Sequence, residues 1–227
     1  GGRVTAVETL LRWQHPERGL VAPGEFISLL EESGLIVPVG RWVLKTACEQ
    51  GRVWHDAGTP VRVAVNLSVR QFKHPGLVAD VAEILAESGL PPELLELELT
   101  ESMFMDSATA DANKLTQLKA LGVSLAIDDF GSGASSLAYL KDFPVDTLKI
   151  CQSFVLNLPH NNDDSAIASA VLGLAQAMNF TSVAEGVENA QQADFLRERR
   201  CDYFQGYLFS KPLPVEDLNQ LLNGSKL

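Results

Sequence analysis

The feature that most constrains this fold is a regular alternation between short apolar stretches and segments with helical periodicity. The short stretches predict buried strands at Val4–Leu11, Val61–Leu67, Leu94–Leu99, Val123–Ile127, Thr147–Ile150, Ser182–Ala184 and Asp202–Phe204. The intervening segments predict helices at Gly24–Ser33, Val39–Ala57, Gly76–Ser88, Thr109–Leu121, Ser135–Lys141, Asp164–Met178, Asn189–Glu198 and Val215–Leu222. Such alternation is typical of parallel strands joined by right-handed helical crossovers, so the sequence predicts an α/β fold.

Polar side chains gather at the ends of the predicted strands. Glu8 lies within the first strand, and the others are Asn66, Glu98, Glu101, Asp128, Asp129, Lys149, Glu185, Glu188 and Gln205. An open sheet would spread these groups along a line, whereas a closed ring of strands brings them to one mouth. We therefore expect a TIM-like (β/α)8 barrel. Because the 227 residues fall just short of the roughly 250 of a complete barrel, and one strand is lacking, we expect the first strand and leading helix to lie upstream of Gly1.

Five of these groups are carboxylates that would share the barrel mouth with Asn66, namely Glu8, Glu98, Asp128, Asp129 and Glu185. So many carboxylates cannot all stay ionised at short range unless cations lie among them. Oxygen ligands suit Mg²⁺, Mn²⁺ or Ca²⁺ better than zinc. The adjacent Asp128–Asp129 pair can bridge two metal ions, and two ions roughly 3.5–4 Å apart suit in-line attack on a phosphodiester. Lys149 would then orient the attacking water or stabilise charge on the phosphate.

A structural interpretation competes with this one. Any one strand-end acid is more often a helix N-cap or a surface group, and Asp128–Asp129 could form only a turn and a cap. The joint pattern over several strands favours a functional site.

Charge and cysteine content exclude other classes. The formal net charge is −11, with no basic stripe, so binding of a DNA or RNA polymer by phosphate neutralisation is not expected. An anionic ligand remains possible if metal ions supply positive charge.

The three cysteines, Cys48, Cys151 and Cys201, have no disulfide or zinc spacing, so we expect buried free thiols in a reducing cytoplasm. No apolar run reaches the roughly 18 residues of a membrane span, and no signal peptide is recognised.

Several longer strings carry a resemblance to one family. They are ETLLRW (Glu8–Trp13), HPERGLVAPGEFISLLEESGLI (His15–Ile36), VNLSVRQF (Val65–Phe72), LELTES (Leu97–Ser102), AIDDFGSGASSL (Ala126–Leu137), DTLKI (Asp146–Ile150), VAEGVE (Val183–Glu188) and QGYLFSKPLP (Gln205–Pro214). In order and spacing, over nearly the whole chain, the sequence resembles the EAL-domain cyclic di-GMP phosphodiesterases.

The resemblance implies a barrel of the EAL type, whose first strand runs antiparallel to the rest, and hydrolysis of cyclic di-GMP to linear pGpG with two Mg²⁺ or Mn²⁺ ions. Ca²⁺ is expected to inhibit.

The resemblance also implies roles for individual residues. One ion would be held by Glu8, Asn66, Glu98 and Asp128, and the other by Asp128, Asp129 and Glu185. The catalytic candidates are Lys149, Glu8, Asp129 and Glu101, of which Lys149 would touch the nucleophilic water and Glu101 would brace the Asp-Asp loop. The substrate-binding candidates are Leu11, Arg12, Glu188 and Gln205.

The sequence departs from the family pattern at Thr9, Ser132, Ala134 and Cys151. The last departure matters most, because Cys151 stands where an acid usually follows Lys149-Ile150. A thiol is a weak hydrogen-bond donor and stays largely neutral near its ordinary pKa of roughly 8.5. Loss of such a supporting acid commonly costs roughly 10–100-fold in metal affinity or activity, so we expect reduced activity rather than none.

Three functions compete on these residues. A metal-dependent phosphodiesterase is favoured over a degenerate EAL domain that only senses cyclic di-GMP, because every expected metal ligand is present. An acid-pair glycosidase is disfavoured by the three Trp and three Tyr, too few for sugar platforms. We expect one EAL domain at residues 1–227, taken from a larger cytoplasmic protein with an adjacent GGDEF or sensor domain, and a homodimer is possible. The full-length protein could be membrane-anchored through other domains.

Overall fold

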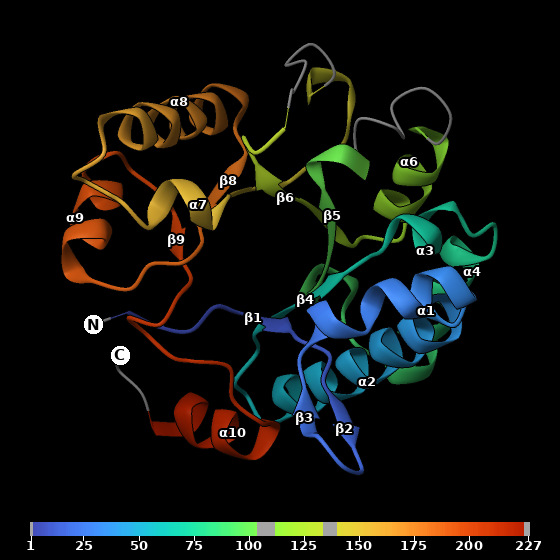
Figure 1. The fold of residues 1–227 in the computed structure, drawn as a ribbon. Helices are drawn as coiled ribbons and strands as arrows, with labels where there is room; N and C mark the ends of the chain where they lie inside the picture. Colours follow the sequence, from blue (N-terminus) through green and yellow to red (C-terminus); the bar gives the residue numbers. More distant parts are fainter. Residues whose placement is uncertain (1, 104–111, 134–139, 225–227) are drawn as a thin grey trace. The chain divides into compact units, whose positions relative to one another are not determined.

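A computed structural model describes residues 2–103, 112–133 and 140–224. The chain consists of two compact units. Its helices and strands are shown in Figure 1. Of the described residues, unit 1 comprises those within Gly1–Glu98 and Gln117–Ser124, and unit 2 comprises those within Leu99–Thr116 and Leu125–Ser225. The predicted Ser135–Lys141 helix falls largely outside the described residues, as does Ala134.

Unit 1 is built on three parallel strands in the order β1 (Ala6–Thr9), β4 (Arg62–Asn66) and β5 (Leu95–Thr100). Its other elements are the hairpin of β2 (Trp13–His15) and β3 (Gly19–Val21), the 3₁₀ turns η1 (Pro23–Glu25) and η2 (Pro92–Leu94), and the helices α1 (Ile27–Ser33), α2 (Ile36–Asp56), α3 (Val69–Lys73) and α4 (Leu77–Ser88). Because β1 runs parallel to β4, the antiparallel first strand that the resemblance implies is not β1.

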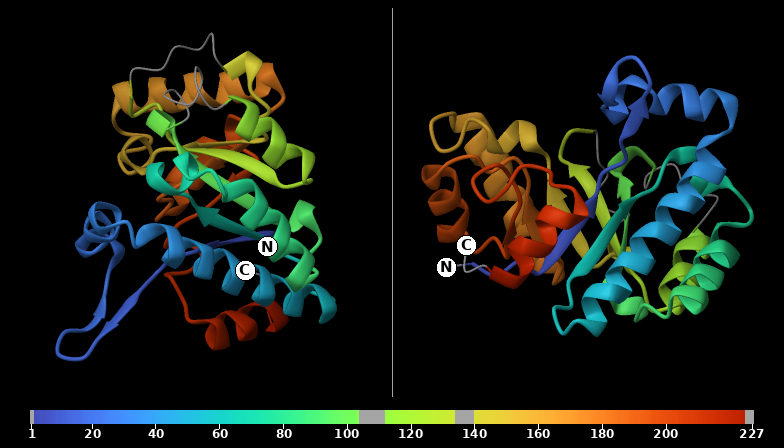
Figure 2. Two further views of the ribbon diagram at one scale, coloured as in Figure 1. Left: turned by 90° about the vertical axis from the view of Figure 1, so that its right-hand side faces the viewer. Right: turned by 90° about the horizontal axis from the view of Figure 1, so that it is seen from below.

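Helix α2 packs closely on its neighbours because two of its buried positions are glycines. A Cβ at Gly51 would lie 2.9 Å from the side chain of Val63 in β4, and a Cβ at Gly40 would lie 1.8 Å from Nε2 of Gln71 in α3. Helix α2 also lies beside α4 (Figure 2). Arg41 of α2 forms ion pairs there with Asp80 and Glu83.

Unit 2 contains four parallel strands in the order β6 (Ser124–Phe130), β7 (Thr147–Ile150), β8 (Thr181–Ala184) and β9 (Tyr203–Phe204). Its helices are α7 (Gln152–Val155), α8 (Asn162–Met178), α9 (Ala190–Glu198) and α10 (Val215–Gly224), with the 3₁₀ turn η3 (Leu140–Asp142), and α6 (Ala112–Ala120) crosses the boundary of the two units. Two acids tie neighbouring strand starts together: Asp146 accepts a hydrogen bond from Leu125 N–H at 2.7 Å, and Asp202 accepts one from Ser182 N–H at 2.8 Å.

Strands β5 and β7 are buried on both faces, as parallel strands usually are. In β5 the leucines at 95, 97 and 99 are buried on one face, while Glu96 and Glu98 are buried on the other. In β7 Thr147 and Lys149 are likewise buried. Since the interior face carries polar groups, it can serve chemistry as well as packing.

Most of the predicted elements are confirmed, including the α/β class and every predicted strand. The prediction missed the β2–β3 hairpin, α3 and α7, and it began α2 three residues late because Pro38 fits within a first helical turn. The three cysteines are buried and free, as expected. Among the described residues, no helix is both long and apolar enough to cross a membrane.

Candidate metal centre

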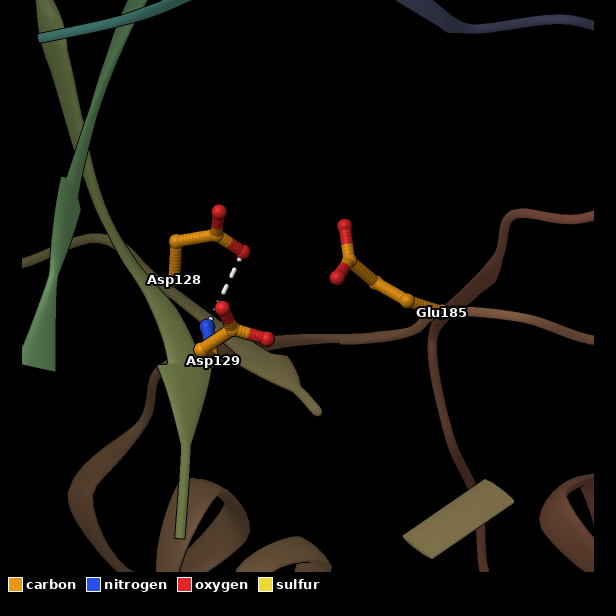
Figure 3. Close-up of side chains that lie close together, drawn as sticks. All are labelled: Asp128, Asp129 and Glu185. Atoms are coloured by element: carbon orange, nitrogen blue, oxygen red, sulfur yellow. Dashed lines mark hydrogen bonds between the residues drawn. The ribbon is translucent and has the colours of Figure 1, made fainter. Parts of the chain in front are cut away.

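Three carboxylates come together in unit 2. Asp128 and Asp129 lie near the end of β6, and Glu185 follows β8 directly. Each offers an oxygen atom that lies within 4.8 Å of those of the other two. In Figure 3 the three side chains point toward a common space. Asp128 and Glu185 are half-buried and Asp129 is exposed, so the cluster opens to solvent.

A local break in β6 allows consecutive aspartates to share this space. In a regular strand, neighbouring side chains point to opposite faces. Here the pairing of β6 with β7 shifts register between Ile127 and Phe130, and Asp129 has the left-handed φ of 53°. Its backbone N–H donates to Oδ1 of Asp128 at 3.0 Å (Figure 3). A bulge of this kind turns a side chain toward a new direction, here that of Asp128.

Glu101 supports the turn that follows Asp129. Its side chain is buried, and Oε2 accepts hydrogen bonds from Gly131 N–H at 2.8 Å and from Gly133 N–H at 3.3 Å. The hydroxyl of Ser132 donates to the carbonyl of Asp129 at 2.7 Å. The turn is therefore held from both sides.

Lys149 reaches the same cluster from β7. Its Nζ lies 2.8 Å from Oε1 of Glu185 and 3.4 Å from Oδ1 of Asp128. When ionised, the three carboxylates and one ammonium leave two negative charges in excess. Oxygen donors with such an excess fit a hard divalent cation such as Mg²⁺ or Mn²⁺. The residues present thus suit the metals that the resemblance implies.

Cys151 lies two residues beyond Lys149, beside Asp129. Its Sγ is 3.1 Å from the hydroxyl of Ser153. Burial raises the pKa of the Cys151 thiol, and the Asp129 carboxylate adds to that rise, so the group stays neutral near pH 7. Cys151 is also the N-cap residue of α7, and its side chain caps no backbone N–H.

The two segments that carry Glu188 and Gln205 are joined through their backbones. Val187 N–H donates to the carbonyl of Gln205 at 3.0 Å, and Leu208 N–H donates to the carbonyl of Val187 at 3.0 Å. A Cβ at Gly206 would lie 2.2 Å from the Val187 carbonyl oxygen, so only glycine permits this approach. Glu188 is exposed and Gln205 is half-buried.

Unit 1 brings together three of its predicted site residues. Nδ2 of Asn66 donates to Oε1 of Glu8 at 2.7 Å, and Asn66 is the register partner of Glu98 across β4 and β5. Glu98 is buried, whereas Asn66 is exposed. Leu11 and Arg12 follow β1 and are half-buried, and the Arg12 guanidinium donates to the Leu11 carbonyl at 2.8 Å.

Two buried glutamines escaped the sequence analysis. Gln71 and Gln192 each stand three residues after the N-cap of a helix, Ser68 and Asn189, and each completes a capping box. The S/T/N-x-x-Q spacing was the available signal. Gln71 orders the segment that follows Asn66, and Gln192 orders the segment around Glu188.

Comparison with known proteins adds a family. The family model described as the EAL domain matches residues 1–212. The chain is 48% identical over 218 residues to the bifunctional diguanylate cyclase/cyclic di-GMP phosphodiesterase MucR of Pseudomonas aeruginosa, covering 96% of this chain and 32% of that protein. It is 45% identical over 222 residues to the cyclic di-GMP phosphodiesterase NbdA of the same organism, covering 97% of this chain and 28% of that protein. The chain thus spans about a third of the length of these relatives.

A solved structure agrees with the sequence relationship. The MucR phosphodiesterase in complex with c-di-GMP has a TM-score of 0.93 and 48% identity, with 96% of this chain and 88% of that chain covered. The prediction of a (β/α) barrel-like fold of the EAL type is confirmed by this likeness.

Proposed function

Because the chain belongs to the EAL-domain family, we propose that it hydrolyses one phosphodiester bond of cyclic di-GMP to give linear pGpG. The observation that carries the proposal is the group of Asp128, Asp129 and Glu185, in which Asp128 and Glu185 form ion pairs with Lys149. Relatives named as cyclic di-GMP phosphodiesterases, and a related structure that holds c-di-GMP, support the choice of substrate.

The residues that would hold two Mg²⁺ or Mn²⁺ ions fall into two sets. By resemblance, Glu8, Asn66, Glu98 and Asp128 would hold one ion, and Asp128, Asp129 and Glu185 would hold the other. When bound, the ions would neutralise phosphate charge and make a bound water more acidic. The all-oxygen chemistry of both sets supports this assignment.

The chain's own groups complete the site. The Lys149 ammonium, which forms ion pairs with Asp128 and Glu185, would donate hydrogen bonds to the attacking water or a phosphate oxygen. The Arg12 guanidinium would bind a substrate phosphate, and Leu11 would supply an apolar contact to the ligand. Glu188 and Gln205, on joined segments, would bind the edge of a guanine, whose N–H groups suit carboxylate and amide oxygens.

The alternative is a receptor that binds cyclic di-GMP without cutting it. The observation in its favour is Cys151, whose neutral thiol stands beside Asp129 where the family pattern has an acid. The carboxylates at the other expected positions favour the enzyme.

The deciding experiment is incubation of the purified chain with cyclic di-GMP and either Mg²⁺ or Mn²⁺, with pGpG followed by chromatography. Formation of pGpG supports the phosphodiesterase. Tight binding with no product under either metal would establish the receptor instead.

The relatives extend far beyond this chain, and the name MucR includes a diguanylate cyclase activity. We therefore propose that the domain acts beside a cyclase or sensor domain in a cytoplasmic setting, with homodimers as one mode of control. The excess of acidic residues is consistent with a metal-mediated dinucleotide substrate and not with a nucleic-acid polymer.

A further inference from the structure

We infer that Gln192 is a positioning residue for substrate binding: its buried amide fixes the backbone of Glu188 and fastens it to the segment that follows β7. This inference rests on the proposed function, because Glu188 matters to it as a guanine contact. Gln192 lies in the first turn of α9 and is only 1% exposed. It was singled out neither by the motifs nor by the chemistry of the metal centre.

The oxygen of the Gln192 side-chain amide binds the backbone at Glu188. Oε1 accepts hydrogen bonds from Glu188 N–H at 2.6 Å and from Asn189 N–H at 3.1 Å. In return, Gln192 N–H donates to Oδ1 of Asn189 at 3.0 Å. The backbone on both sides of the Glu188 Cα atom is therefore held through one side-chain oxygen.

The nitrogen of the same amide donates a hydrogen bond to a different segment of the chain. Nε2 donates to the carbonyl of Leu156 at 2.9 Å, at the end of α7. Because α7 begins just after β7, Gln192 connects the Glu188 loop to the stretch of chain that carries Lys149 and Cys151.

A second contact joins the same two segments. Gly186, between Glu185 and Glu188, has a φ of +69°, and a Cβ there would lie 2.3 Å from Cγ of Gln152 at the start of α7. The Glu188 loop and α7 are thus held together at both ends of α7, by packing at Gln152 and by the amide of Gln192.

Only glutamine satisfies all of these partners. Two N–H donors require an acceptor on one side of the group, and a carbonyl requires a donor on the other. A glutamate keeps the acceptor but sets a second oxygen against the Leu156 carbonyl, and a leucine offers neither group. The pattern also fixes which atom of the amide is the oxygen.

The test compares Gln192→Leu and Gln192→Glu with Gln191→Leu as a matched control. Gln191 is the preceding residue, is exposed, and contacts His160 instead. The kinetic readout is KM and kcat for cyclic di-GMP, with Kd from calorimetry as a check. The structural readout is the amide hydrogen-exchange rate of Glu188, which needs neither metal nor substrate.

For Gln192→Leu we expect KM to rise at least about tenfold while kcat stays within about twofold, since three side-chain hydrogen bonds are lost and a single well-formed buried one corresponds to about tenfold. Glu188 N–H should exchange at least about tenfold faster. Gln192→Glu keeps the acceptor but loses the donor to the Leu156 carbonyl, so its KM and Glu188 exchange rate should rise less than those of Gln192→Leu. The values for Gln191→Leu should lie near those of the parent protein. If Gln192→Leu does not fold, Gln192→Glu decides the question: a raised KM with faster Glu188 exchange supports the inference, and parent values of both overturn it.

A purely structural role has a different signature. It would reduce the folded fraction and lower kcat in proportion, with KM unchanged, and that result would overturn the inference. Unchanged exchange at Glu188 in Gln192→Leu would do the same. A parent protein that neither cleaves nor binds cyclic di-GMP would instead overturn the proposed function, together with the substrate-binding part of this inference.

Discussion

Replacing Glu101 by glutamine removes one negative charge from beneath the Asp128–Asp129 turn while keeping the shape of the side chain. A single oxygen, Oε2, accepts from Gly131 N–H at 2.8 Å and from Gly133 N–H at 3.3 Å. Hydrogen bonds to a charged group contribute about 1.5–3 kcal/mol and neutral ones about 0.5–1.5 kcal/mol. Neutralisation should therefore cost about 1 kcal/mol for each bond, or about 2 kcal/mol in all.

The hydrogen-bond energy lost in this way is comparable to the backbone strain at Asp129 that the hydrogen bonds of Glu101 offset. Asp129 has a left-handed φ of 53°, which costs a residue with a Cβ about 1–2 kcal/mol. A loss of about 2 kcal/mol lowers the equilibrium constant for forming the competent turn by about 30-fold. We expect Glu101→Gln to lower the Mn²⁺ affinity and kcat by up to that factor.

Isothermal calorimetry with Mn²⁺ and chromatography of pGpG would measure the two effects. Glu198→Gln is the control, because it removes the same charge from a side chain that is 78% exposed. If Glu101→Gln keeps a Mn²⁺ affinity and a kcat within about twofold of the parent, the charge of Glu101 does not stabilise the Asp128–Asp129 turn, and the prediction is wrong.

Four further predictions concern other parts of the chain. Cys151→Asp should raise turnover and Mn²⁺ affinity by about tenfold, and unchanged kinetics would contradict the supporting role given to that position. Ca²⁺ as the sole metal should give no pGpG in the same chromatographic assay, because its longer, more flexible coordination suits in-line geometry poorly; normal turnover would count against this. Burial raises the pKa of Cys48 to about 12 and that of Cys201 to about 11, so both thiols stay protonated at pH 8 and should react with Ellman's reagent only after denaturation. Gly40→Ala should lower the free energy of unfolding by about 1–3 kcal/mol in urea titrations, since its Cβ would lie 1.8 Å from Gln71. An unchanged urea midpoint would show that α2 and α3 can move apart without loss of stability.

The sequence predicts strands better than the details that make the site work. Asp128 and Asp129 are recognisable from their place after an apolar run and from the family strings. Their shared direction is not, because it depends on a register shift and on Glu101, which is remote in sequence from the turn it supports. Periodicity describes neighbours along the chain, whereas this turn is held by a residue from another strand end.

For Gln192, too, the sequence predicts the contact with a near neighbour but not the contact with a distant residue. Its spacing from Asn189 predicts the start of a helix, and α9 does begin at Ala190. Nothing local indicates the bond from its Nε2 to the Leu156 carbonyl, 36 residues away. Pairings of this kind arise only once the segments are folded against each other.

The tryptophans have an uneven distribution with a spectroscopic consequence. All three, Trp13, Trp42 and Trp54, belong to unit 1, and Trp54 is buried while Trp42 is 59% exposed. Intrinsic tryptophan emission is therefore a built-in label for unit 1, whereas the three clustered carboxylates around Lys149 belong to unit 2. Since the proposed ligands Glu8, Asn66 and Glu98 also belong to unit 1, a melting curve followed by this emission measures how far added Mn²⁺ stabilises that unit.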